Sequence, residues 1–545
     1  MAVHPEVTVR APVRRHRPAA LAALTGHALL GTVRNPIGLF FTVAFPLTFL
    51  VILASIIGDQ QTGQGVPTAQ FLVAPFAVFG VAQAAFVLLA VDMTGLRERG
   101  VLLRMRATPI PAWTVPASRI TAAAATSVVT VLLLAAVGVA AFDVQIFWGK
   151  VPAMLVTLLL GTACCAALGL AMASLARSVA VAQSLGQGLL VSLAYISDVF
   201  IVGADLPRWM DVLGSALPLK HFARAMAATF DPATGSAFAP AHLAVLAVWT
   251  VAGMIVAGLR FGWAPRGIAT LRPAAATPET ATTERLSPPA EHRRSALSTV
   301  AGQIGYSLLG LRRNLMSVFF SLVFPVLLLV LFPAVFGDSR VHGMSLAQYL
   351  FAGMIAYTAA LNGFVDVSEA VVVARSTGVL KRLRGTPLSL RWYFAGRTGA
   401  AALVSLTVAI LLTATGVVFL DVRVDAARSP ALLVAVVAGS LCFTALGLAI
   451  AALMPSARSI IAVTLGTLLP LCFASEIFVV GDQPLPGWLA TVAGVLPLRH
   501  LLLAVLTATD PAVAGAGFAP GHLAVLAGWT VAGLLVLRSR QAALS

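Results

Sequence analysis

The chain has 545 residues, of which 59% are hydrophobic and only 10% are charged, and its formal net charge is +16. A soluble protein of this size would carry about 25% charged residues, so the composition excludes a soluble globular protein. The basic excess does not indicate a nucleic-acid-binding face, because the Lys and Arg residues cluster in a few segments between apolar blocks.

Apolar blocks in the first half predict six membrane-spanning helices, each near the roughly 20 residues that cross a ~30 Å hydrocarbon core. Before them, residues 1–35 are expected to hold a cytoplasmic tail and an amphipathic elbow helix along the membrane surface. A secretion signal is the alternative for this stretch, but no small-residue cleavage site stands out. The expected spans of the first unit, residues 36–263, lie near 36–57, 70–93, 118–141, 151–175, 179–202 and 241–261.

The second half has the same organisation. Residues 264–296 are rich in Pro, Thr, Ala and charge and are predicted to be a flexible cytoplasmic linker. A second elbow helix is expected at 297–314, a second six-span unit at 315–537 and a cytoplasmic tail at 538–545. The spans of this unit are expected near 315–336, 346–371, 396–420, 429–454, 459–481 and 520–537.

The two units are copies of each other. Residues 34–59 match residues 313–338, and residues 238–253 match residues 518–533 almost letter for letter, with an offset that stays between 278 and 280 residues. This constant offset indicates a fused tandem repeat. The predicted fold is therefore an all-α polytopic membrane protein with twelve transmembrane helices in two tandem units, and a pathway is expected where the two units meet.

The distribution of positive charge predicts the orientation. With both termini in the cytoplasm, 28 of the 36 Lys and Arg residues fall on the cytoplasmic side. Because Lys and Arg are retained in cytoplasmic loops, this split favours cytoplasmic termini. The expected location is a bacterial plasma membrane.

A basic cytoplasmic loop follows the second span of each unit. Apolar and basic residues alternate in it, so a short helix there would have one apolar and one basic side. A loop that simply obeys the positive-inside rule is one interpretation; a docking element for another protein is the favoured one, because both copies keep Gly, Leu, Arg and Thr-Pro in register. The candidate residues are Glu98, Arg99, Gly100, Leu102, Arg104, Arg106, Gly378, Leu380, Lys381, Arg382 and Arg384.

The loop motif E-x-G-x-L-x-R-x-x-x-T-P at residues 98–109 resembles the coupling loop of type-2 ABC exporter permeases. The whole arrangement is most similar to the fused two-unit permeases of actinobacterial antibiotic exporters. This resemblance implies two separately encoded ATP-hydrolysing subunits that seat the two loops, and a lid above the exit. Ser376 stands where the first loop has Glu98, so the two docking contacts are expected to be unequal.

No nucleotide-binding motif accompanies these loops. The phosphate-loop pattern G-x-x-x-x-G-K-[ST] occurs nowhere in the sequence, so the chain has no visible means of holding nucleotide phosphates. We therefore expect no cofactor in this chain, and ATP and Mg to be bound by the partner subunits. The chain itself is not expected to be an enzyme.

A long segment between spans five and six of each unit is broken by Pro and Gly. Its apolar pieces are too short to span, so re-entrant lid helices in the outer leaflet are predicted. Asp198 and Glu476 occupy matching positions just before this segment. They either anchor the helix end, for example by pairing with Lys220 and Arg499, or contact substrate or a cation.

Other polar residues are expected along the pathway. Asp92 lies near the inner end of span two in the first unit, and Asp366 and Glu369 in the second unit either face a cavity or a partner or lie close to the inner interface. A charged residue inside a membrane usually faces a cavity or a partner. The expected pathway lining includes Gln83, Gln183, Gln187 and Asn362.

No metal centre is predicted from the spacing of cysteines or histidines. His221 and His500 belong to the predicted outer gate, with lid packing as the favoured role. The thiols are interpreted as buried and inert: Cys164, Cys165, Cys442 and Cys472.

The leading hypothesis is the permease subunit of an ATP-driven exporter for an amphipathic small molecule, such as an antibiotic, a drug or a lipid-like compound. Spans one, two and five of both units would line its route. A proton- or ion-coupled secondary transporter with twelve spans is the rival. A membrane-embedded lipid-modifying enzyme is a third possibility, but it would require a catalytic constellation at one interface, and the sequence offers none.

Overall fold

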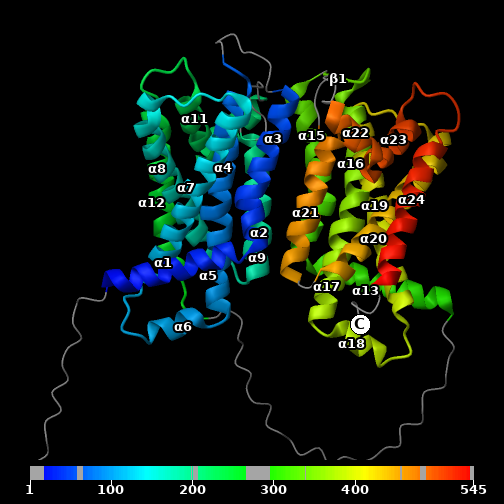
Figure 1. The fold of residues 1–545 in the computed structure, drawn as a ribbon, viewed down its shortest axis with the longest axis horizontal. Coiled ribbons are helices and arrows are strands. Elements are labelled where there is room, and N and C mark those ends of the chain that lie inside the picture. The colour runs from blue at the N-terminus through cyan, green and yellow to red at the C-terminus, as the bar shows by residue number, and fades with distance from the viewer. Residues whose placement is uncertain are drawn as a thin grey trace, which may run out of the picture.

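The computed structural model describes residues 17–57, 66–197, 199, 207–264, 295–337, 339–454, 457–478 and 487–540. Within these ranges the chain forms two helical bundles side by side (Figure 1). The strands of the described part form one short hairpin, in which β1 (Arg340–Val341) pairs antiparallel with β2 (Met344–Ser345).

The first unit begins with α1 (Arg17–Val33), which lies across the ends of the spans. Its elements in chain order are α2 (Pro36–Leu39), η2 (Phe40–Ala44) and α3 (Phe45–Ile57) for span one; α4 (Ala69–Ala82), η3 (Gln83–Leu88) and α5 (Leu89–Glu98) for span two; α6 (Val101–Arg106); α7 (Thr114–Phe142) for span three; η4 (Trp148–Lys150) and α8 (Val151–Leu175) for span four; α9 (Val179–Ile196) for span five; α10 (Arg208–Ala216) and α11 (Pro218–Phe230); and α12 (Pro240–Arg260) for span six.

The second unit repeats this order. Its elements are α13 (Ala296–Arg313); α14 (Leu315–Val318), η5 (Phe319–Val323) and α15 (Phe324–Phe336) for span one; α16 (Leu346–Ala360), η6 (Leu361–Asp366) and α17 (Val367–Ser376) for span two; α18 (Val379–Arg384); α19 (Leu390–Phe419) for span three; η7 (Ala426–Arg428) and α20 (Ser429–Leu453) for span four; α21 (Ala457–Ala474) for span five; α22 (Gly487–Val495) and α23 (Pro497–Thr509); and α24 (Pro520–Ser539) for span six.

Eleven helices in the described ranges are long and apolar enough to cross a membrane. The remaining span of the second unit is α21, whose described apolar stretch is Val463–Ala474; it runs along the bundle in the position that α9 holds in the first unit. The predicted class, a polytopic all-α protein of two tandem six-helix units, is confirmed.

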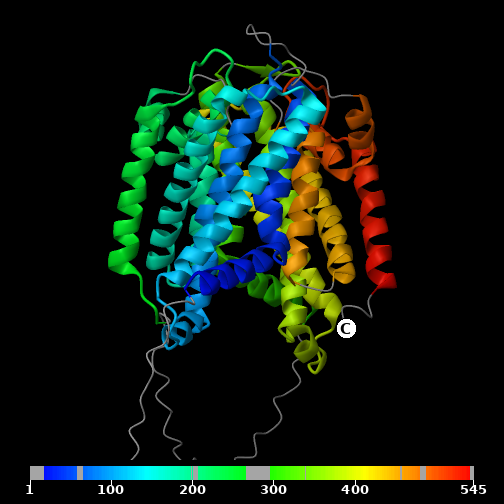
Figure 2. The same ribbon diagram turned by 60° about the vertical axis from the view of Figure 1, so that its left-hand side comes forward.

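Both elbow helices are present. α1 and α13 lie across the bundle at the end that also carries α6 and α18 (Figures 1 and 2), here called the elbow end. Asn35 and Asn314 follow the two elbow helices, and their side-chain oxygens accept the backbone N–H of Gly38 and Ser317 at 3.2 and 3.4 Å. Each Asn thus caps the start of span one, which fixes the turn from elbow to span.

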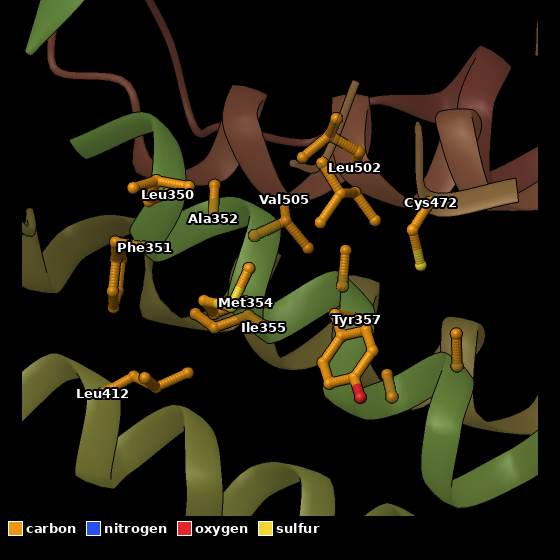
Figure 3. Close-up of a cluster of buried hydrophobic side chains, with 14 of the residues drawn as sticks. Leu350, Phe351, Ala352, Met354, Ile355, Tyr357, Leu412, Cys472, Leu502 and Val505 are labelled. Carbon is orange, nitrogen blue, oxygen red and sulfur yellow. The ribbon is translucent and has the colours of Figure 1, made fainter. Parts of the chain in front are cut away.

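Span two is the centre of each unit. Of its most apolar window, 89% is buried in the first unit and 94% in the second, against 17% for either span six. Figure 3 shows why: side chains of α16 such as Met354 and Ile355 face α19, while Leu502 and Val505 of α23 cover them from another side. Span two is therefore closely packed on its sides, so a shift of span two also displaces the helices around it.

The two units contact each other crosswise. Span one of the first unit packs against α21, and span one of the second unit packs against α9. Aromatic rings fill both contacts: Phe49 and Phe473 have ring centroids 4.5 Å apart, and Tyr195 and Phe332 have theirs 5.8 Å apart. The interface therefore has the pseudo-twofold character that the sequence repeat implies.

Candidate functional site

The loop after span two forms a short helix in both units. Gly100 and Gly378 take φ values of +67° and +73°, so the chain reverses there at little steric cost only because these residues lack a Cβ. The helices that follow, α6 and α18, project from the elbow end beyond the elbow helices (Figure 1). We call them the coupling helices.

The coupling helices are amphipathic, as the alternating sequence predicts. Leu102 and Leu380 are 0% and 2% exposed and hold each helix against its bundle. Leu103 is 50% exposed on the opposite side. The basic residues on the exposed side are Arg104, Arg106, Lys381, Arg382 and Arg384. This face can accept an acidic or amphipathic surface.

Glu98 has an intramolecular contact that the sequence does not reveal. Its carboxylate accepts the backbone N–H of Val179 at 2.9 Å, at the start of α9. A carboxylate there satisfies a free helix N–H and faces the positive end of the helix dipole. Ser376, its counterpart, donates to the carbonyl of Val373 in its own helix at 3.0 Å. The two units thus differ in how span two is tied to span five.

Arg97 and Arg375 belong to this site but were not among the residues predicted from the sequence. Arg97 is 1% exposed and donates to the carbonyl of Ala173 at 2.7 Å and also to that of Ala176, at the end of α8. Arg375 makes the equivalent bonds to the carbonyls of Ala451 and Met454. Each guanidinium caps the last carbonyls of span four. The signal was a matched Arg three residues before the turn glycine in both repeats.

The predicted glutamines meet in a cavity of about 610 Å³ in the first unit, bounded by α1, span one, span two, α7 and α9. Gln83 donates to the Oε1 of Gln187 at 3.0 Å, and Gln183 lines the same space. An ion pair between Asp92 and Arg119, 2.9 Å apart, lies at the wall. Arg99 also lines this cavity, so it is not only a surface residue of the loop.

Asn362 lies apart from the glutamines, in a second cavity of about 280 Å³ at the corresponding place in the second unit. Asp366 and Glu369 line that cavity as well. Asp366 accepts hydroxyl bonds from Ser317 and Ser321 of span one, both at 3.0 Å. Both serines belong to the first two turns of span one, directly after the elbow helix. That Asp366 lies close to the inner interface stays a prediction.

Both cavities border a π-helical turn. η3 and η6 interrupt span two at matching positions, and η2 and η5 interrupt span one. Such turns are rare, insert one residue into the helix and occur frequently at functional sites. Gln83, Asn362 and Asp366 all belong to η3 or η6.

The lid segments are paired short helices at the opposite end, here called the lid end. The break between Leu489–Val495 and Pro497–Thr509 bends by 78°, and a Pro opens α11 and α23 alike. Span six holds each lid by a Trp: the indole N–H of Trp249 reaches the carbonyl of Ala216 at 3.2 Å, and that of Trp529 reaches Val495 at 3.0 Å.

The gate histidines attach the lids to span six. The Nδ1 atoms of His221 and His242 are 2.8 Å apart, and those of His500 and His522 are 2.9 Å apart. His221 and His500 also bond backbone carbonyls of their own lids through Nε2. In the part of the chain that the structure describes, no group of three or more His, Cys, Asp or Glu residues could hold a metal ion.

Of the two acidic residues predicted near the lid, the structure describes Glu476. Glu476 lies 3.2 Å from Arg499, which is the pairing expected if it anchors the helix end. Asp198 lies outside the described residues. Lys220, its expected partner, is buried and binds Asp211 at 2.5 Å within the lid. The hydrogen bond and charge of Lys220 lower the pKa of Asp211 below its usual value of 3.8.

Two six-helix units with elbow helices, projecting amphipathic loops and lids define a membrane transport subunit. The model of the ABC-2 type transporter family matches residues 19–230 and 304–508. Because these matches cover more than half of the chain, the chain belongs to that family and is a multi-pass membrane subunit of an ABC transport system. Permeases of this family are not catalytic alone and normally work with a nucleotide-binding ATPase subunit. No curated protein matches the chain in sequence.

Proposed function

We propose that the chain is the permease of an ATP-driven exporter that moves an amphipathic small molecule out of a bacterial cell across the plasma membrane. Two copies of a separate ATPase subunit bind ATP and Mg and seat the coupling helices, and both termini are cytoplasmic. The observation that carries the proposal is the pair of coupling helices with exposed basic faces, each preceded by an Arg that binds carbonyls at the end of span four.

Force applied to a coupling helix reaches the cavities through few steps. α6 is continuous with span two across one glycine turn, and the buried Arg97 joins this corner to α8. A push on the coupling helix therefore displaces span two together with span four, and with them the wall of the cavity. Cargo that reaches the lid end leaves past the lids near Asp198, Glu476, His221 and His500.

The docking step is tested by co-purifying the full chain with candidate ATPase subunits and measuring ATP hydrolysis. Arg104→Glu and Arg382→Glu reverse exposed charges, so each should reduce complex recovery and hydrolysis at least tenfold. Arg208→Glu, an exposed charge at the lid end, is the matched control and should leave both unchanged. Equal recovery of all three variants would refute docking at the coupling helices.

Glu98→Ala and Arg99→Ala separate docking from internal roles. Because Glu98 caps α9, its loss should weaken coupling of hydrolysis to transport more than assembly itself. Arg99→Ala should reduce assembly. Tags at residue 103 or 382 that are reachable only from outside intact cells would invert the orientation and end this account.

One observation favours the rival function. Asp366 and Glu369 lie one turn apart in a single cavity inside the second bundle, and paired acids within a membrane are a common proton pathway. A proton-coupled secondary transporter would move cargo in proteoliposomes under a proton gradient with no ATPase present. Transport that requires both ATP and the ATPase subunit would exclude this candidate.

A further inference from the structure

Three polar side chains form a row on one face of span two in the second unit. Asn362, Asp366 and Glu369 are spaced by four and three residues, which places them on the same side of a helix. All three line the cavity of about 280 Å³. We call them the acceptor row, because each offers oxygen atoms to that cavity.

Asn362 has a side-chain oxygen that is available to a hydrogen-bond donor. Its side chain is 2% exposed, and its Nδ2 donates to the Oγ of Ser405 at 3.1 Å. Its Oδ1 has no hydrogen-bond partner among the described residues. A buried acceptor left unsatisfied is unfavourable, so a ligand N–H or O–H that reaches it gains a full hydrogen bond.

The carboxylates of the row are not neutralised by the basic residue that lines the same cavity. Arg397 donates from Nε to the hydroxyl of Tyr393 at 3.2 Å, and its guanidinium lies over the rings of Tyr306 and Tyr393. Within the described ranges it makes no ion pair with Asp366 or Glu369. Among the described residues, Asp366 accepts hydrogen bonds only from the two serine hydroxyls.

The first unit provides the contrast. Arg119 occupies the position that matches Arg397, and there it pairs with Asp92 at 2.9 Å. The second unit has Ala370 in place of Asp92, and its acids stand at 366 and 369 instead. The positions that match the acceptor row in the first unit are all apolar and line its cavity: Ala84, Leu88 and Val91. One unit thus carries acceptors where the other carries hydrocarbon.

We propose that the second-unit cavity binds the protonated amine of an amphipathic cargo. An ammonium group carries three donors and a positive charge, so it complements a cavity wall with an unsatisfied amide oxygen and two acidic side chains. The apolar part of the cargo lies against Leu311, Val367 and Val404 on the other walls. The proposal rests on the exporter function and specifies its substrate class.

Binding of a matched pair of small probes tests the proposal without an ATPase. The full chain is held in phosphatidylcholine nanodiscs, and tritiated 2-naphthylmethylamine is compared with 2-naphthylmethanol, its neutral analogue, with empty nanodiscs subtracted. The amine should bind at least tenfold more tightly than the alcohol. Asp366→Asn and Glu369→Gln should each weaken amine binding at least tenfold and leave alcohol binding unchanged.

Leu88→Asn and Val91→Gln introduce the same side chains at the matching positions of the first unit and should leave amine affinity unchanged. Alcohol binding reports that each variant is folded, and Glu369→Gln carries the test if Asp366→Asn does not fold. Equal affinity for both probes, or unchanged amine affinity in the carboxylate variants, overturns the proposal. The exporter function fails by a different result, ATP-independent transport, so the two are distinguishable.

Discussion

Replacing Arg97 by alanine should loosen the contact between span four and the turn that joins span two to α6 in the first unit. The side chain is 1% exposed and donates to two carbonyls at the end of α8, one of them at 2.7 Å. A hydrogen bond with a charged donor contributes about 1.5–3 kcal/mol net, so the loss of two is about 3–6 kcal/mol. We take the lower end of this range, about 3 kcal/mol, as the expected loss.

Amide hydrogen exchange of the full chain in nanodiscs measures this release by region. In the Arg97→Ala variant, protection should fall by roughly a hundredfold at the end of α8 and in α6, since 1.4 kcal/mol corresponds to a factor of ten, while α20 stays protected. Arg104→Ala on the exposed face of α6 is the control. If both variants exchange alike, Arg97 does not fix the turn between span two and α6 to span four, and the proposed path of force is wrong.

Three further predictions concern packing and the lids. Gly447→Ala would place a Cβ 2.5 Å from a carbonyl oxygen of η6, so the folded yield measured by size exclusion should fall sharply. Gly494→Ala is the control and should leave the yield unchanged, because an added Cβ there meets nothing within 4 Å. His522→Phe removes the imidazole contact that holds the second lid, so thiol labelling of a cysteine introduced into α23 by Leu503→Cys should accelerate. Because Lys220 lowers the pKa of Asp211, their pair stabilises the lid fully above the ordinary value of 3.8, and this effect is lost as pH falls through the lowered pKa. The difference in protease protection of α10 between the wild type and Asp211→Asn should therefore stay flat from pH 7 to about 5.

Hydropathy and the repeat predicted the architecture because both can be read directly from the sequence. A constant offset and blocks of about 20 apolar residues are enough to place spans, elbow helices and lids. Helix ends were less accurate: span three was expected at 118–141 and 396–420, but α7 covers Thr114–Phe142 and α19 covers Leu390–Phe419. Both helices begin before the apolar block, where a polar first turn is compatible with a helix and invisible to hydropathy.

Contacts between distant segments could not be predicted in the same way. Arg97 reaches carbonyls 76 and 79 residues away, and Glu98 reaches an N–H 81 residues away. Their sequence context, a basic loop, equally suits a surface role. The predicted pathway residues divide for the same reason: the glutamines meet in one cavity and Asn362 faces another. Only the packing of spans one, two, three and five decides which polar residues share a space.

The π-helical turns and two glycines support the proposed transfer of force from a coupling helix to these cavities. Gly169 of α8 and Gly447 of α20 lie where an added Cβ would meet carbonyl oxygens of η3 and η6 at 2.7 and 2.5 Å. Span four therefore touches span two backbone to backbone at the π turn, and Arg97 and Arg375 join the same two spans at the elbow end. With two such contacts, we expect span two and span four to move together. The face of span two that can change its neighbours is then the opposite one, toward the elbow helix and span three, where both cavities lie.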